Sequence, residues 1–222
     1  MMVSGSNSFK DCSIVSCGIL RPELTFLQES GFLDADKIIY TTPGLHENPR
    51  DLKRQLMEQL EQAKKYSKNI IVVYGSRCYL DFKNPFNTID KIIAKSGKHI
   101  YRVKTGNCID ILANMEEREK IAGGQRIYWL TMGWLLFWRL IFKDWDAGKA
   151  NETFPMNDKA VILDLSNAFN SYSKENPEKV LEFSDWMKIP IESHPVSWKR
   201  IKRLLTQAKD KAVFGEGLNL SP

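Results

Sequence analysis

The sequence has little of what usually marks a function. Its 222 residues contain only four cysteines and three histidines. The cysteines lack the paired Cys-x-x-Cys spacing of a zinc ribbon. No Walker sequence and no Gly-x-Ser-x-Gly elbow is present, so the sequence gives no support for a P-loop nucleotide site or a serine hydrolase. Internal repeats and low-complexity tracts are also absent.

Long hydrophobic runs are missing as well. The most apolar segment, from Tyr128 to Phe142, contains Arg139 and falls short of the roughly 20 apolar residues that cross a membrane. We therefore expect it to be core. The first ten residues carry too little hydrophobic length for a signal peptide, and we expect residues 1–10 to be flexible. These features predict a cytoplasmic protein with no membrane partner.

The charge does not identify a partner. A net charge of +5 is modest, and it does not indicate nucleic acid binding. Much of the positive excess lies in the last helical segment, which starts near Trp198 and has apolar residues on one face and lysines and arginines on the other. Such a helix binds an acidic partner or packs on its own domain, and packing is the preferred interpretation.

Apolar runs rich in Ile, Val and Tyr recur along the chain, and several are continuous instead of alternating, as in strands buried on both faces of a parallel sheet. These runs are Cys12 to Ile19, Lys37 to Thr42, Asn69 to Gly75, His99 to Lys104, Arg126 to Thr131 and Ala160 to Leu165. Helical patterns separate them, including Leu52 to Ala63 and Asn107 to Ile121. This alternation predicts an α/β fold with a mainly parallel sheet of about five to seven strands and helices on both faces. We expect a single α/β domain over residues 11–222, with a C-terminal helical extension from about residue 177.

Soft metal ligands follow several of the expected strands. Cys17 ends the first, Cys78 comes shortly after the third, Cys108 follows the fourth, and His46 lies in the loop after the second. Ligands of parallel α/β sheets bind outside the carboxyl ends of the strands. We therefore expect these four side chains to converge there, whereas Cys12 lies inside the first strand and is expected in the core.

A set of three cysteines and one histidine suits zinc and also an iron–sulfur cluster. If three of the residues bind zinc and one position stays open, the ion is catalytic instead of structural. Without a metal, Cys108 at the start of a helix would have a lowered thiol pKa and could act as a nucleophile assisted by His46. The remaining alternative is that the cysteines are buried packing residues.

The aromatic segment offers a wall for the same site. The strand that ends at Thr131 turns at Gly133 into a helix that begins with Trp134. Thr131 and Trp134 are therefore expected to face the crevice and contact a cofactor, unless the aromatic residues of this helix simply pack in the core.

Several blocks resemble a known family. SCGILRPEL, GLHENPRDL, VVYGSRCYLD, NCIDILANMEEREKIAGG and YWLTMGWL are similar to successive blocks of the domain of unknown function 1638 family, a group found in anaerobic prokaryotes. The similarity runs from about Cys12 to Trp198. The cysteine and histidine elements that recur in that family map onto Cys17, His46, Cys78 and Cys108. In many members the third element is Tyr-x-x-Cys-Gly, whereas here Cys78 lies further from the tyrosine and Tyr79 replaces the glycine.

The resemblance implies an association with corrinoid-dependent methyl transfer and supplies no established reaction. Three functional hypotheses follow. The first is a metal-binding or cofactor-binding protein, with zinc, an iron–sulfur cluster or a corrinoid as the group, that serves one-carbon metabolism beside a corrinoid protein or methyltransferase. The second is an enzyme with a nucleophilic cysteine, and the third is an accessory binding module without metal.

Overall fold

The computed structural model describes residues 8–81 and 84–215. Within them, seven strands form two sheets in which every neighbouring pair is parallel. The first sheet has the order β2-β1-β3-β4, with β1 (Cys12–Cys17), β2 (Lys37–Thr41), β3 (Asn69–Val73) and β4 (Ile100–Arg102). The second has the order β5-β6-β7, with β5 (Ile127–Leu130), β6 (Lys159–Asp164) and β7 (Ile191–Pro195). The expected parallel α/β class is confirmed, and the strands divide between two sheets instead of joining one.

The first sheet is covered on both faces, which explains its continuous apolar strands. Along β1, Ile14 packs with the helices on one face, while the next residue, Val15, packs with the helices on the other face. The same alternation holds for Ile71 and Val72 in β3. The covering helices are α1 (Arg21–Glu29), α2 (Pro49–Ala63), α3 (Ile89–Ser96) and α10 (Trp198–Phe214).

The expected helix from Asn107 to Ile121 is instead two helices, α4 (Cys108–Leu112) and α5 (Met115–Ala122). Between them Ala113 is extended, with φ −141° and ψ 133°. Asn107 and Asn114 each form a capping box with the acidic residue three positions later, so the chain starts a helix twice.

The second sheet carries helices rich in aromatic residues. They are α6 (Met132–Ile141), α7 (Ala147–Thr153), α8 (Ala168–Glu175) and α9 (Pro177–Met187). Within this layer the ring of Trp186 contacts both Phe142 and Trp138, with centroid distances of 4.9 Å and 5.2 Å. Most of the apolar segment from Tyr128 to Phe142 therefore belongs to the core, as expected, although Leu136 and Leu140 are exposed. No helix in the described part of the chain is long and apolar enough to cross a membrane.

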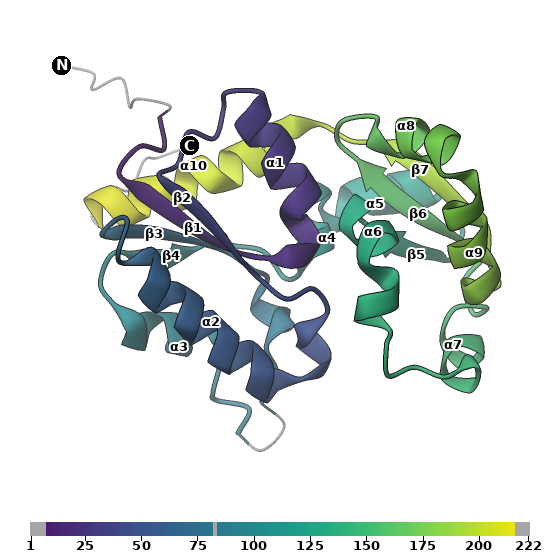
Figure 1. Cartoon of the computed structure of the whole chain (residues 1–222), viewed down its shortest axis with the longest axis horizontal. Helices are drawn as coiled ribbons and strands as arrows, with labels where there is room; N and C mark the ends of the chain where they lie inside the picture. Colours follow the sequence, from purple (N-terminus) through teal and green to yellow (C-terminus); the bar gives the residue numbers. More distant parts are fainter. Residues whose placement is uncertain (1–7, 82–83, 216–222) are drawn as a thin grey trace.

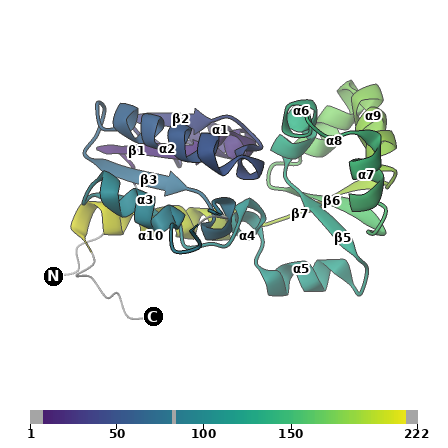
Figure 2. The ribbon, with the colours of Figure 1, turned by 90° about the horizontal axis from the view of Figure 1, so that it is seen from below.

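The two sheets belong to two lobes that lie side by side (Figures 1 and 2). The first lobe comprises residues 8–112 and 198–215, and the second comprises residues 114–196. The chain returns from β7 to the first lobe through α10, which buries Ile201, Leu205 and Ala208 against that lobe and does not leave its apolar face open. The expected C-terminal helical part from about residue 177 thus also contains a strand, β7.

The N-terminal segment is only partly described. Residues 1–7 of the expected flexible stretch lie outside the described residues. Phe9 is buried at 1% exposure, and its ring lies 5.3 Å from that of Phe32. The last residues of the stretch are therefore anchored in the core.

Candidate functional site

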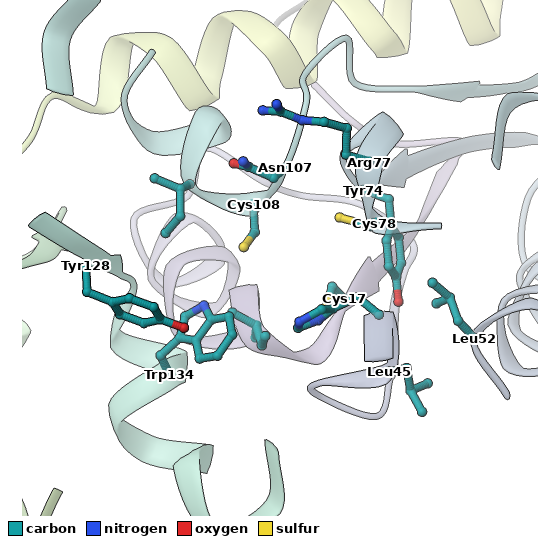
Figure 3. Close-up of a pocket in the computed structure, with 13 residues that line it drawn as sticks. Cys17, Leu45, Leu52, Tyr74, Arg77, Cys78, Asn107, Cys108, Tyr128 and Trp134 are labelled. Carbon is teal, nitrogen blue, oxygen red and sulfur yellow. The ribbon is translucent and has the colours of Figure 1, made fainter. Parts of the chain in front are cut away.

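A cavity of about 270 Å³ lies between the two lobes, at the carboxyl ends of the strands of the first sheet. Cys17, Cys78, Cys108 and His46 all line it, together with Trp134 from the second lobe (Figure 3). The three thiols interact electrostatically with one another and are each partly exposed. Cys12 is fully buried in the core of the first lobe and lies outside this group. The sheet-edge rule thus placed all four residues at one cavity.

Cys17 is the last residue of β1 and precedes the short 3-10 helix η1 (Gly18–Leu20). Burial raises the pKa of its thiol to about 12, while donation from the backbone amides of Ile19 and Gly44 and from the Tyr74 hydroxyl opposes this rise. The Tyr74 hydroxyl also forms a short hydrogen bond with the Thr41 hydroxyl. Cys17 is therefore held by local donors and stays protonated near neutral pH.

Cys78 ends the 3-10 helix η3 (Ser76–Cys78), in the loop that follows β3. The amides of Ser76 and Arg77 donate to the carbonyls of Thr105 and Gly106, each at 2.8 Å, which joins this loop to the one after β4. A Cβ atom on Gly75 would lie 2.2 Å from the Cα of Asn107, so only glycine permits this approach. The two loops are therefore close enough to bring Cys78 beside Cys108.

The electrostatic surroundings of Cys78 differ from those of the other two thiols. Burial raises its pKa, but the Gly75 and Cys108 backbone amides and the guanidinium groups of Arg102 and Arg77 all oppose the rise. Arg102 is buried and donates to the carbonyl of Tyr74 at 3.0 Å and to both oxygens of Asp90 at 2.9 Å. The pKa of Cys78 is still raised, and among the principal influences on the three thiols only those on Cys78 include neighbouring cations that oppose the rise.

Cys108 is the first residue of α4. A lowered pKa was expected at this position, but burial raises the pKa of its thiol well above the ordinary value, and the nearby Cys78 and Cys17 raise it further. The nearby Trp134 indole opposes this rise in pKa, although its Nε1 has no hydrogen-bond partner among the described residues. Desolvation therefore outweighs the helix terminus, and the expected lowering is wrong.

His46 lies in the 3-10 helix η2 (Leu45–Glu47), and its ring centroid is 5.8 Å from that of Trp134. The residue is exposed at the rim of the cavity, yet burial of the imidazole lowers its pKa, with the Glu47 carboxylate opposing the shift. A neutral imidazole can bind a metal or accept a proton. Gly44, with φ +83°, makes the turn before it and would place a Cβ 3.0 Å from the Cα of Ile141 in α6.

The second lobe forms one wall of the cavity. Trp134 is 8% exposed and faces the thiols. Tyr128 of β5 joins it, and burial raises the pKa of its hydroxyl to about 12. Thr131 was expected to face the same crevice, but it is fully buried at the start of α6 and does not line the cavity.

No group of three histidine, cysteine or acidic side chains within residues 8–81 and 84–215 is close enough to hold a metal ion. The donors therefore share one cavity at a spacing wider than a coordination sphere. Their chemistry suits a soft metal, and side-chain movement is needed for all of them to contact one ion.

Several lining residues were not anticipated from the sequence. Arg77, Asn107 and Tyr128 all reach the cavity. Arg102 does not line the cavity but acts on Cys78, and it was missed as well. An arginine inside an apolar strand was a usable signal, because a buried guanidinium requires partners. Tyr128 carried no such signal, since only the approach of the second lobe brings it to the thiols.

Comparison with known proteins supports the sequence resemblance. A family model described as "Protein of unknown function (DUF1638)" matches residues 40–205. No curated protein and no solved structure matches the chain. The matched region contains His46, Cys78 and Cys108, while Cys17 precedes it. Because the match covers most of the chain, this protein belongs to the DUF1638 family.

Proposed function

We propose that the cavity between the lobes binds a soft metal ion, with Cys17, Cys78 and Cys108 as thiolate ligands and His46 as a fourth donor. One observation carries the proposal: three partly exposed thiols, far apart in the sequence, line one cavity, while the fourth cysteine is buried elsewhere. Thiolate and imidazole ligands suit zinc, and the same set could hold an iron–sulfur cluster. A reducing location such as the cytoplasm belongs to the proposal, because all four cysteines are free thiols.

The protonation state of the cavity sets the pH dependence of metal binding in this proposal. Burial raises the pKa of each of the three thiols, so the protein alone favours neutral thiols there. A bound cation reverses that preference, since a coordinating thiol loses its proton. Metal binding should therefore release protons and weaken as the pH falls.

The chain's own residues would shape what happens at such a centre. Zinc with an open coordination position can polarise a bound ligand or activate a bound water. Trp134 and Tyr128 limit the access of water from the second lobe, and Tyr74 holds a hydroxyl beside Cys17. These residues confine a ligand to a small space beside the thiols.

The experiment is metal analysis of anaerobically purified protein. We expect about one zinc per chain, and we expect its loss in Cys17→Ser, Cys78→Ser and Cys108→Ser variants that remain folded. Cys12→Ser is the matched control and should keep its metal. If the wild type carries no metal and every serine variant loses about 1–3 kcal/mol of unfolding free energy, the cysteines are packing residues and the proposal is rejected.

A role beside corrinoid-dependent methyl transfer is the finer part of the proposal, and it is supported only by the sequence resemblance. The cavity, at about 270 Å³, lies below the roughly 300–1,000 Å³ of typical ligand pockets. A corrinoid ring is larger than such ligands, so it would have to be presented by a partner corrinoid protein or methyltransferase. Titration of the metal-loaded chain with free cobalamin tests this, and tight binding of the isolated cofactor would contradict the size argument.

A thiol-dependent enzyme is the second candidate, and one observation favours it. Arg77 and Arg102 oppose the burial-induced rise in the pKa of Cys78, whereas Cys78 and Cys17 add to the rise in the pKa of Cys108. Cys78 therefore replaces Cys108 as the better nucleophile, with His46 lining the same cavity as a base. Alkylation of the metal-free protein should then be fastest at Cys78, and equal rates at all three thiols would argue against a special nucleophile.

A further inference from the structure

The polar groups that line the cavity are mostly hydrogen-bond donors. Besides the thiols and His46, they are Tyr74, Arg77, Asn107, Tyr128 and Trp134, and each can donate a hydrogen bond. No aspartate or glutamate of the described chain is among the lining residues. A cavity rich in donors and without carboxylates is complementary to a ligand that supplies acceptor oxygens.

Two of these donors have unused capacity. Trp134 is 8% exposed, and its Nε1 has no hydrogen-bond partner within the described structure. Asn107 uses its Oδ1 to accept the amide of Asp110 at 2.9 Å. Its side-chain amide hydrogens therefore remain available at the cavity, since an amide NH2 carries two donors.

Arg77 adds a positive charge that Asp110 only partly neutralises. Its guanidinium lies 3.3 Å from Oδ2 of Asp110, an oxygen that also accepts the backbone amides of Gly106 and Asn107 at 3.1 and 3.2 Å. Arg118 donates to the other oxygen of the same carboxylate at 2.6 Å. Two guanidinium groups thus share one carboxylate, and Arg77 has the longer bond and a side chain that is 65% exposed.

The arrangement in space matches a ligand with two different ends. Arg77 and Asn107 lie on one side of the thiols, and Tyr128 and Trp134 lie on the other (Figure 3). One incompletely paired guanidinium matches a single negative charge better than a doubly charged phosphate. Its planar fork and the neighbouring amide suit a carboxylate, which Arg binds with two parallel hydrogen bonds.

We propose that the cavity takes a small organic carboxylate, with the carboxylate on Arg77 and Asn107 and the apolar body against Tyr128 and Trp134. This inference rests on the proposed function in one respect, because it is the metal-loaded thiols that such a molecule would meet. It assigns a substrate class to the site.

Alkylation of the thiols tests the carboxylate site directly. Iodoacetate and iodoacetamide have the same size and differ only in carrying a carboxylate or a neutral amide. With either reagent the thiolate displaces iodide from the methylene carbon and forms a thioether. The fraction of thiolate and its nucleophilicity cancel in the ratio of the two rates, so the ratio reports the preference of the surroundings for a carboxylate.

The experiment uses the full chain after removal of metal by a chelator, with modification at each cysteine followed by mass spectrometry. We expect the iodoacetate to iodoacetamide rate ratio at Cys78 to exceed that of free cysteine by about threefold to tenfold. Arg77→Gln should return the ratio to that of free cysteine, and Arg77→Lys should keep part of the preference. Arg126→Gln is the matched control, because Arg126 is 69% exposed and also pairs with one carboxylate; its ratio should equal that of the wild type.

A wild-type ratio no higher than that of free cysteine, or a ratio that Arg77→Gln leaves unchanged, overturns the carboxylate site. Circular dichroism of each variant verifies that it is folded, and Arg77 is exposed enough that its replacement should not unfold the chain. Zinc content is measured on the same proteins before chelation. Zinc without a carboxylate preference rejects this inference alone, whereas an Arg77-dependent preference in a protein that binds no metal rejects the metal proposal alone.

Discussion

At the scale of single residues, the most unusual side chain outside the cavity is Glu23. It is 4% exposed in α1, and its Oε1 accepts the amide of Met132 at 3.2 Å across the lobe interface. Burial raises the pKa of this carboxyl from 4.5 to about 8, and the Asp164 carboxylate contributes to the rise. Glu23 is therefore protonated over a pH range in which an unfolded chain would have ionised it.

This shift predicts a pH-dependent stability. A carboxyl whose pKa is raised in the folded state favours folding fully below the unfolded value of 4.5, and that contribution is lost as the pH rises towards about 8. Glu23→Gln keeps the acceptor for Met132 and cannot ionise. We expect it to raise the melting temperature at pH 8.5 by at least roughly 2–4 °C, the equivalent of about 1 kcal/mol, and to have a smaller effect at pH 5.

Glu29→Gln on the same helix is the control, because Glu29 is exposed. It should not change the pH dependence of thermal unfolding. If Glu23→Gln lowers the melting temperature at pH 8.5, the buried carboxyl is stabilising as a charge and the assignment of a neutral Glu23 is wrong.

At the scale of elements, the sequence predicted β1 to β6 better than it predicted β7 and the helix boundaries. The continuous apolar runs located β1 to β6, because burial on both faces leaves a strong pattern. The sequence did not reveal β7, because Ile191–Pro195 mixes polar residues with a proline and resembles a loop. The break between α4 and α5 was also missed, although Asn107 and Asn114 each precede an acidic residue at capping-box spacing.

The site was predicted in part for the same reason. Strand ends are set by local sequence, so the positions of Cys17, Cys78 and Cys108 at one edge followed from the strands alone. The raised pKa of Cys108 did not follow, because it depends on burial that the approach of Trp134 and two other thiols produces. Thr131 does not line the cavity for a related reason, since it is buried where the start of α6 packs against the first lobe.

At the scale of the whole molecule, the cavity exists because the lobes are held together closely beside it. Gly133 near the start of α6 lies so near η1 that a Cβ atom there would be 1.8 Å from the carbonyl oxygen of Ile19. Gly44 makes a second close approach to α6, at Ile141. These two contacts place Trp134 and His46 against the thiols of the first lobe.

Replacing Gly133 by alanine should therefore separate the lobes. Alanine normally stabilises a helix by about 1 kcal/mol relative to glycine, but the overlap with Ile19 should cost more, so we expect a net loss of about 1–3 kcal/mol. Metal binding should weaken together with stability, as measured by urea unfolding and metal titration. Gly148→Ala in α7 is the control, because its nearest new contact is a side-chain oxygen of Asp146 at 3.3 Å; equal effects of the two substitutions would contradict a special role for the lobe contact.

The central claim is that the thiols from three strand ends bind one metal ion, and X-ray absorption spectroscopy of the zinc-loaded protein tests it most directly. We expect about three sulfur ligands at roughly 2.3 Å and one nitrogen at roughly 2.0 Å. A spectrum that fits only oxygen and nitrogen ligands, or a protein that takes up no metal under anaerobic conditions, would contradict the claim.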